Sequence, residues 1–108
     1  MAHSYKLSGA ALTTTAQTSI LTAATGETII LKSIILSNNT SNTPTATLEV
    51  TDTSASATYK IVNTEGTTAN TAEQLIAEPL ILEPTDILKI TMSSTDAVDV
   101  TMSYLSIT

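Results

Sequence analysis

The sequence predicts an all-β fold of about eight antiparallel strands, folded as a sandwich or a barrel. Thr and Ser make up about a third of the 108 residues, and the β-branched Thr favours strands over helix interiors. Gly, Pro and Asn interrupt the chain at short intervals, as turns between strands do. Between these breaks apolar and polar residues alternate with period two, which is the pattern of a half-buried strand.

Eight segments carry the strand pattern. The alternation is clean in 45–51, where Leu48 and Val50 share one face and Thr residues occupy the other. Thr71 and Gln74 match a helical capping box, so one helical turn stays an alternative at 73–77, where we favour a strand that feeds an edge segment. The expected strands are Ser4–Ser8, Thr18–Ala23, Glu27–Ser37, Thr45–Thr51, Ala57–Asn63, Glu73–Ala77 with Leu80–Leu82, Asp86–Ser93 and Ala97–Ile107.

The segment Glu27–Ser37 differs from the others because both of its faces are apolar. A strand of an antiparallel sandwich normally has one solvated face. The second face therefore needs cover, either from the N-terminal segment or from another copy of the chain. Strict alternation assigns Ile30, Ile34 and Leu36 to one face and Ile29, Leu31 and Ile35 to the other.

The first sixteen residues are predicted to form an N-terminal arm or a short edge strand, and residues 17–108 the sandwich domain. Apart from Leu12, residues 10–16 are Ala or Thr, small or polar side chains, which favours an arm that becomes ordered on a partner. Together with the two-faced strand, this arm supplies the candidate residues for contact with another copy or another protein. These residues are Tyr5, Leu7, Ile29, Leu31 and Ile35.

The charge of the chain excludes several classes of partner. Four Lys and Arg residues stand against ten acidic ones, which gives a net charge of -6. Binding to nucleic acid requires clustered cations, and an anionic membrane surface repels an acidic protein. Aliphatic stretches such as Ile29–Leu31 and Leu80–Leu82 are too short for a membrane span or a signal-peptide core. We therefore expect no nucleic-acid or membrane partner.

Residue types that carry catalysis are scarce. The chain has no Cys, and its single histidine is His3. The carboxylate pairs Glu83 with Asp86 and Asp96 with Asp99 flank expected turns, where acids commonly cap the turn. The segments 83–86 and 94–96 offer oxygen ligands for a divalent ion, but the spacing of a calcium-binding loop is missing. We expect no catalytic residue, no cofactor and no metal site, so the chain is predicted not to be an enzyme.

The aromatic residues leave one alternative open. Tyr5, Tyr59 and Tyr104 are the only aromatic side chains. Three tyrosines could line a sugar-binding surface, which would make the chain a carbohydrate-binding module. We favour a place in the core or in an interface, since tyrosine buries a large apolar surface at either.

The segments from residue 17 to 107 follow a characteristic order. A short strand, Thr18–Ala23, turns at Gly26 into the long apolar strand, and a Thr-rich strand and a strand with Tyr59 follow. A Leu-rich approach over 79–90 and the alternating Val98–Tyr104 close the order. This order resembles the small all-β structural proteins of tailed bacteriophage virions. Those proteins have Gly before the Asp that opens the penultimate strand, whereas this chain has Thr85.

The resemblance implies a single antiparallel β-sandwich, jelly-roll-like, without catalytic residues. It also implies a location in the virion, after synthesis in the cytoplasm of the host bacterium, and assembly in several copies, with a trimer favoured. Within that class we favour a capsid decoration or cement protein, which binds the major capsid protein and stabilises the assembled shell. A neck, tail or fibre component is the alternative.

Overall fold

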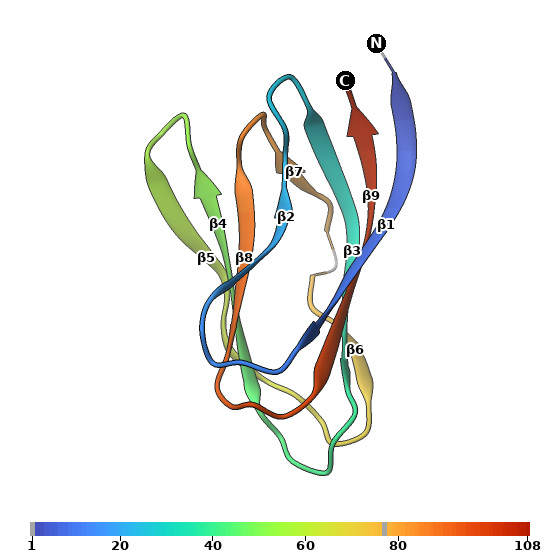
Figure 1. Cartoon of the computed structure of the whole chain (residues 1–108), viewed down its shortest axis with the longest axis vertical. Coiled ribbons are helices and arrows are strands. Elements are labelled where there is room, and N and C mark those ends of the chain that lie inside the picture. The colour runs from blue at the N-terminus through green and yellow to red at the C-terminus, as the bar shows by residue number, and fades with distance from the viewer. Residues whose placement is uncertain (1, 77) are drawn as a thin grey trace.

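In the part of the chain that the structure describes, nine strands form two antiparallel sheets that pack face to face (Figure 1). The structure, a computed structural model, describes residues 2–76 and 78–108. The strands are β1 His3–Leu12, β2 Thr18–Thr22, β3 Thr28–Asn38, β4 Thr45–Asp52, β5 Ala57–Gly66, β6 Ala72–Gln74, β7 Leu80–Leu82, β8 Ile87–Met92 and β9 Val98–Ile107. The all-β sandwich is confirmed. No helix long and apolar enough to cross a bilayer occurs among the described residues.

The order of the strands follows from which neighbours pair. One sheet runs β1-β9-β3-β6, with β7 also paired to β3, and the other runs β2-β8-β4-β5. Because β6 and β7 both pair with β3, they act as one interrupted edge strand. Counted as one, they give two four-stranded sheets around a common core. Apart from β4 and β5, which form a hairpin within one sheet, strands that follow each other in sequence lie in opposite sheets.

The core between the sheets is aliphatic. Alternation in 86–93 and 97–107 predicts its residues correctly, since Leu88, Ile90 and Met92 point inward from β8 and Val98, Val100 and Met102 from β9. Leu48 and Leu82 complete the centre, each fully buried. Such side chains contribute roughly 1.5–3 kcal/mol each to folding, which suits a core without Phe or Trp.

A bulge in β3 changes the faces that strict alternation assigns. Against β9 the register shifts between Leu31 and Ser33, so that Lys32 is an extra residue and the strand reverses its parity there. Ile29, Leu31, Ile34 and Leu36 all face the core, while Ile30 and Ile35 face outward. The predicted two faces of Glu27–Ser37 are therefore wrong. Most of the large apolar side chains of this strand therefore project into the core, both before and after the bulge.

The N-terminal segment forms an edge strand. Residues 3–12 pair with β9 over their whole length, from His3 opposite Ile107 to Leu12 opposite Val98. Of the two predicted forms, a loose arm is therefore wrong for these residues, and β1 belongs to the sandwich with residues 17–108. The strand lies beside β9 in the plane of the sheet, so it does not cover the outer face of β3 (Figure 1). Met1 lies outside the described residues.

The ambiguous segment after residue 70 is extended. Ala72–Gln74 forms β6, paired with β3 at Ile35, Leu36 and Ser37, and Leu80–Leu82 forms β7. The predicted edge segment Leu80–Leu82 is therefore present, whereas of the predicted strand Glu73–Ala77 only Glu73 and Gln74 are in a strand. Leu75 and Ile76 lie outside β6, and Ala77 lies outside the described residues.

Asn38 ties the end of β3 to two loops. The side chain is 1% exposed, and its Nδ2 donates to the Asn42 carbonyl at 2.8 Å and to Thr67 Oγ1 at 3.2 Å. Its Oδ1 accepts from the backbone N–H of Thr40 at 3.0 Å and from the Thr40 hydroxyl at 2.8 Å. A buried amide with all its partners present fixes one arrangement of these loops.

Thr85 occupies a backbone conformation that suits glycine. Its φ is 72° in the turn between β7 and β8, and a β-branched residue is strained there. We expect Thr85→Gly to raise the free energy of unfolding by about 0.5–1 kcal/mol, because relief of strain exceeds the added chain entropy.

The matched control for this prediction is Thr85→Ala, which keeps the Cβ and loses the hydrogen bond between the hydroxyls of Thr85 and Thr53. Thermal unfolding followed by circular dichroism measures both variants. An increase in Tm for the Ala variant equal to that of the Gly variant would show that backbone strain is not the cause.

Candidate functional site

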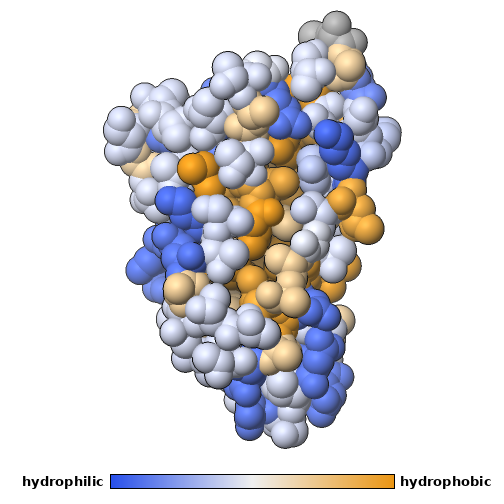
Figure 2. Space-filling model, in the orientation of Figure 1, coloured by the Kyte–Doolittle hydropathy of each residue, from blue (hydrophilic) through white to orange (hydrophobic). Residues whose placement is uncertain are grey.

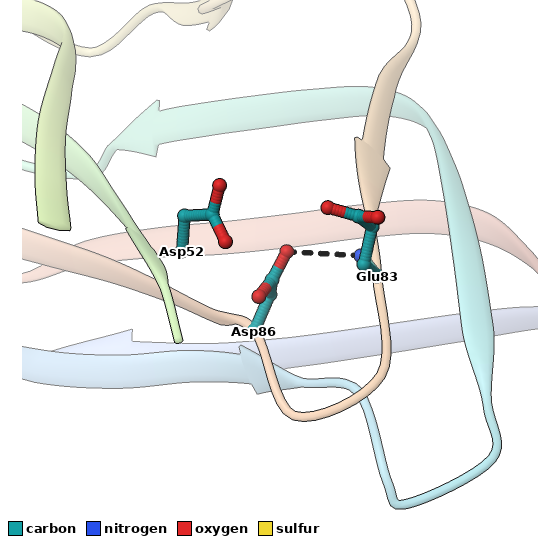
Figure 3. Close-up of side chains that lie close together, drawn as sticks. All are labelled: Asp52, Glu83 and Asp86. Atoms are coloured by element: carbon teal, nitrogen blue, oxygen red, sulfur yellow. Dashed lines mark hydrogen bonds between the residues drawn. The ribbon is translucent and has the colours of Figure 1, made fainter. Parts of the chain in front are cut away.

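Three acids from two turns meet at one end of the sandwich. The carboxylates of Asp52, Glu83 and Asp86 lie within 4.8 Å of one another (Figure 3). Asp86 is buried, and its two oxygens accept from the backbone N–H groups of Thr53 at 3.1 Å and Glu83 at 3.0 Å. Asp86 therefore joins the β4–β5 turn to the β7–β8 turn. Asp52, which is distant from the other two in sequence, accepts from Ser54 Oγ at 2.8 Å and from the Ala55 N–H at 3.3 Å within its own turn.

The second predicted pair of acids does not converge. Asp96 accepts hydrogen bonds from Ser94 Oγ at 2.6 Å and Asn42 Nδ2 at 2.9 Å, whereas Asp99 accepts from Asn39 Nδ2 at 3.0 Å. The bond from Ser94, and then that from Asn42, lowers the pKa of Asp96. A lowered pKa keeps this carboxyl group ionised at neutral pH, which is the opposite of what a general acid requires.

The three tyrosines lie apart. Tyr5 projects from β1, at the edge of one sheet, and Tyr59 from β5, at the far edge of the other. Tyr104 packs against the core. A sugar-binding platform needs neighbouring aromatic faces, so the tyrosines do not supply one jointly.

The outer face of the β1-β9-β3 sheet carries an apolar row. Tyr5 stands opposite Leu105, Leu105 opposite Ile30, and Ile30 opposite Ile81. Residues directly opposite in antiparallel strands project from the same face and touch. The row therefore crosses four strands, and Tyr5 and Ile81 at its ends are 82% and 60% exposed. Leu7 and Ile35 are exposed on the same face.

This row revises the predicted contact residues. Tyr5, Leu7 and Ile35 lie exposed on one face, as a contact surface requires. Ile29 and Leu31 are 1% and 0% exposed and belong to the core, so their selection was wrong, because the bulge at Lys32 was not anticipated. Sequence reasoning missed Ile81 and Leu105, which the strand register alone brings beside Ile30.

The outer face of the β1-β9-β3 sheet carries few charged side chains. Within residues 3–12, 28–38 and 98–107, Asp99 is the acidic residue at an outward position, and it lies at the end remote from the row. Glu27, in the β2–β3 loop, is bonded to the Ala24 N–H and to Ser106 Oγ. The bond from Ala24, followed by that from Ser106 and the charge of Lys6, lowers the pKa of Glu27.

A second apolar feature lies where the two sheets part. An open groove of about 320 Å³ runs between β5 and the β6–β7 edge. Its lining residues are Ile61, Val62, Leu75, Ile76, Glu78, Pro79 and Leu80. In Figure 2 hydrophobic side chains form a band between the two sheets, and others reach the margin of the molecule along β1.

No protein-family model matches the sequence, and no curated protein matches it significantly. Among solved structures the chain is similar to a pentameric capsid protein from metagenomic phage sequences, with a TM-score of 0.43 and 17% identity. It is also similar to the capsid asymmetric unit of cyanophage Pam1, with a TM-score of 0.46 and 18% identity.

The matches cover a larger share of this chain than of the two solved chains. The matches cover 93% and 95% of this chain. They cover 59% of the metagenomic phage protein and 84% of the cyanophage chain, so this chain spans little more than half the length of the first.

Proposed function

We propose that the protein is a structural component of a tailed-phage virion, a decoration or cement protein that binds the assembled shell through the outer face of β1, β9, β3 and β7. The observation that carries this proposal is the row of Tyr5, Leu105, Ile30 and Ile81 on the outer face of a folded sheet. Tyr5 and Ile81 are exposed, and Leu105 and Ile30 between them are half-buried. A contiguous exposed apolar patch on a soluble domain marks an interaction site. The assignment to the structural proteins of phage virions rests on the order of segments in the sequence.

The character of the face favours a protein partner. Lys32 at the bulge and Asp99 at the far end are the charged residues nearest to it in β3 and β9, so electrostatic capture contributes little. Apolar contact with the major capsid protein, centred on an aromatic side chain, supplies the affinity. Tyr5 is well suited to that role because tyrosine combines a large apolar ring with a hydroxyl group.

Stabilisation of the shell follows from mass action. A protein that binds the assembled shell and not the dissociated subunits stabilises it by RT ln(1 + [L]/Kd), which is about 2.7 kcal/mol per site at a hundredfold excess over Kd. No chemical step is required, and the residues described here supply positioned apolar surface for this purpose.

The experiment compares particles that carry the protein with particles that lack it. We expect the wild-type chain to raise the temperature at which heated particles release DNA. Ile81→Glu, which places a charge within the apolar row, should weaken shell binding at least tenfold and remove most of that increase. The matched control is Asn63→Glu, an exposed position on β5 in the other sheet, which should behave as wild type.

Two results would count against the proposal. Equal release temperatures for decorated and undecorated particles would reject the cement role. A band intensity in purified particles far below that of the major capsid protein would place the chain in the neck or tail instead.

A further inference from the structure

The N-terminal half of β1 is exposed on both of its faces. Residues 3–7 are all exposed, including Tyr5 at 82% and Leu7 at 72%, although the strand keeps an uninterrupted register with β9. Main-chain bonds along one side therefore hold this half-strand in place. Its other side is the edge of the sheet, where the N–H and C=O groups have no neighbouring strand within residues 2–76 and 78–108.

The other edges of the sandwich are protected in ways that β1 is not. Natural sheets blunt their edges by keeping the strands short, by bulges, and by charged residues or Pro. β6 and β7 have three residues each, β2 has five residues and an irregular register with β8, and β5 carries Lys60 and Glu65 with two register shifts against β4. β1 is ten residues long, without Pro or a bulge, and Lys6 is its one Lys, Arg, Asp or Glu residue.

We propose that β1 pairs antiparallel with β1 of a second copy across a twofold axis, so that one continuous sheet runs through both molecules. Such an interface is self-complementary, because each strand offers the other the same row of donors and acceptors. The pairing goes beyond the proposed role in a virion and does not depend on it.

Charge favours a second copy as the occupant of this edge. All ten acidic residues lie outside β1, so two chains of net charge -6 can meet here without opposing carboxylates. Lys6 is close enough to Glu27 for its charge to lower the pKa of that carboxyl group. The positive charge of Lys6 is therefore balanced by the Glu27 carboxylate of the same molecule.

The side chains select the register of the pair. To keep the outer faces of both copies on one side of the sheet, opposed residues must have the same parity, so one residue lies on the axis. An axis at Lys6 would oppose two like charges, which is unfavourable. An axis at Leu7 instead pairs Leu7 with its counterpart, Lys6 with Ser8 and Tyr5 with Gly9.

The pairing of Tyr5 with Gly9 provides shape complementarity. A glycine in a strand leaves a gap on the face of the sheet, and an aromatic ring on the neighbouring strand covers such a gap. Gly9 is also constrained, because a Cβ at this position would lie 3.2 Å from the Val100 carbonyl oxygen. In the pair, two tyrosine rings cover two glycines on either side of the Leu7 contact.

A cysteine cross-link tests this register in a chain that has no Cys of its own. Leu7→Cys should form a disulfide-linked dimer under mild oxidation, since the two residues face each other at the axis. Tyr5→Cys is the matched control, equally accessible on the same face. In this register its two copies lie four residue steps apart, about 13 Å, which is too far for a disulfide. Equal cross-linking of both variants, or none of Leu7→Cys, would overturn the proposal.

Light scattering over a range of concentrations tests the assembly itself. We expect a dimer for the wild type and at least a tenfold higher dimer Kd for Leu7→Glu, which opposes two carboxylates at the axis. Ile81→Glu, on the same face but remote from β1, should remain a dimer even where it fails to bind the shell. This separates failure of the pairing from failure of the shell-binding role. A monomer at all concentrations, or the trimer implied by the phage resemblance, would contradict the twofold pairing.

Discussion

Leu31→Ala is expected to lower the free energy of unfolding by about 2–5 kcal/mol, because Leu31 is fully buried between the sheets and its truncation leaves a cavity. The neighbouring variant Ile30→Ala should cost about 1 kcal/mol or less, since Ile30 projects from the outer face. Urea unfolding followed by far-ultraviolet circular dichroism measures both. The matched pair tests the bulge at Lys32 directly.

A reversal of these two costs would contradict the structure. Strict alternation from Leu36 back through Ile34 would make Ile30 a core residue and Leu31 an outer one. A larger loss for Ile30→Ala would therefore show that β3 has no bulge. Equal losses would show that the outer face is covered as tightly as the core.

Asn38→Asp should destabilise the protein by about 3 kcal/mol or more at pH 7. The Asn38 amide donates to the carbonyls of Asn42 and Thr68 and to the Thr67 hydroxyl, and an ionised carboxylate would turn an acceptor toward these oxygens. A buried donor lost in this way costs about 1–3 kcal/mol for each group left unpaired, and an uncompensated charge adds to it.

The same variant should show a characteristic pH dependence. Burial among acceptors raises the pKa of the new carboxyl group above its unfolded value, so the native state binds a proton more readily than the unfolded state. The deficit relative to wild type should therefore shrink as the pH falls through that raised pKa. Asn63→Asp, exposed on β5, is the control and should show neither effect. A small deficit that does not change with pH would mean that Asn38 is not buried as described.

The inner faces of β8 and β9 could be predicted from the sequence because the inward residues of these strands follow unbroken alternation. Leu88 through Met92 and Val98 through Met102 each keep one parity, so the alternation alone identifies the buried face. In β3 the same rule failed after one extra residue. Its sequence does contain a signal, since Lys32 and Ser33 interrupt an otherwise apolar run, and a polar pair at that point is compatible with a change of parity.

The contact surface was less accessible to sequence analysis. Tyr5 and Leu7 were selected because they are the large apolar residues of a polar segment, and both are exposed. Leu105 and Ile81 become visible only when the register of β9 against β3, and of β3 against β7, is known. Because these strands are distant in sequence, no local pattern predicts which outward residues share a row.

The place of β9 between β1 and β3 has a consequence for the order of events during synthesis. β1 leaves the ribosome before the other described strands but has no partner among them within its sheet until residues 98–107 follow, because β9 is the strand beside it. Contacts between segments so distant in sequence form slowly. Throughout translation the nascent chain therefore carries a long unpaired strand, and neighbouring chains on one messenger could pair through it before each molecule closes its own sheet.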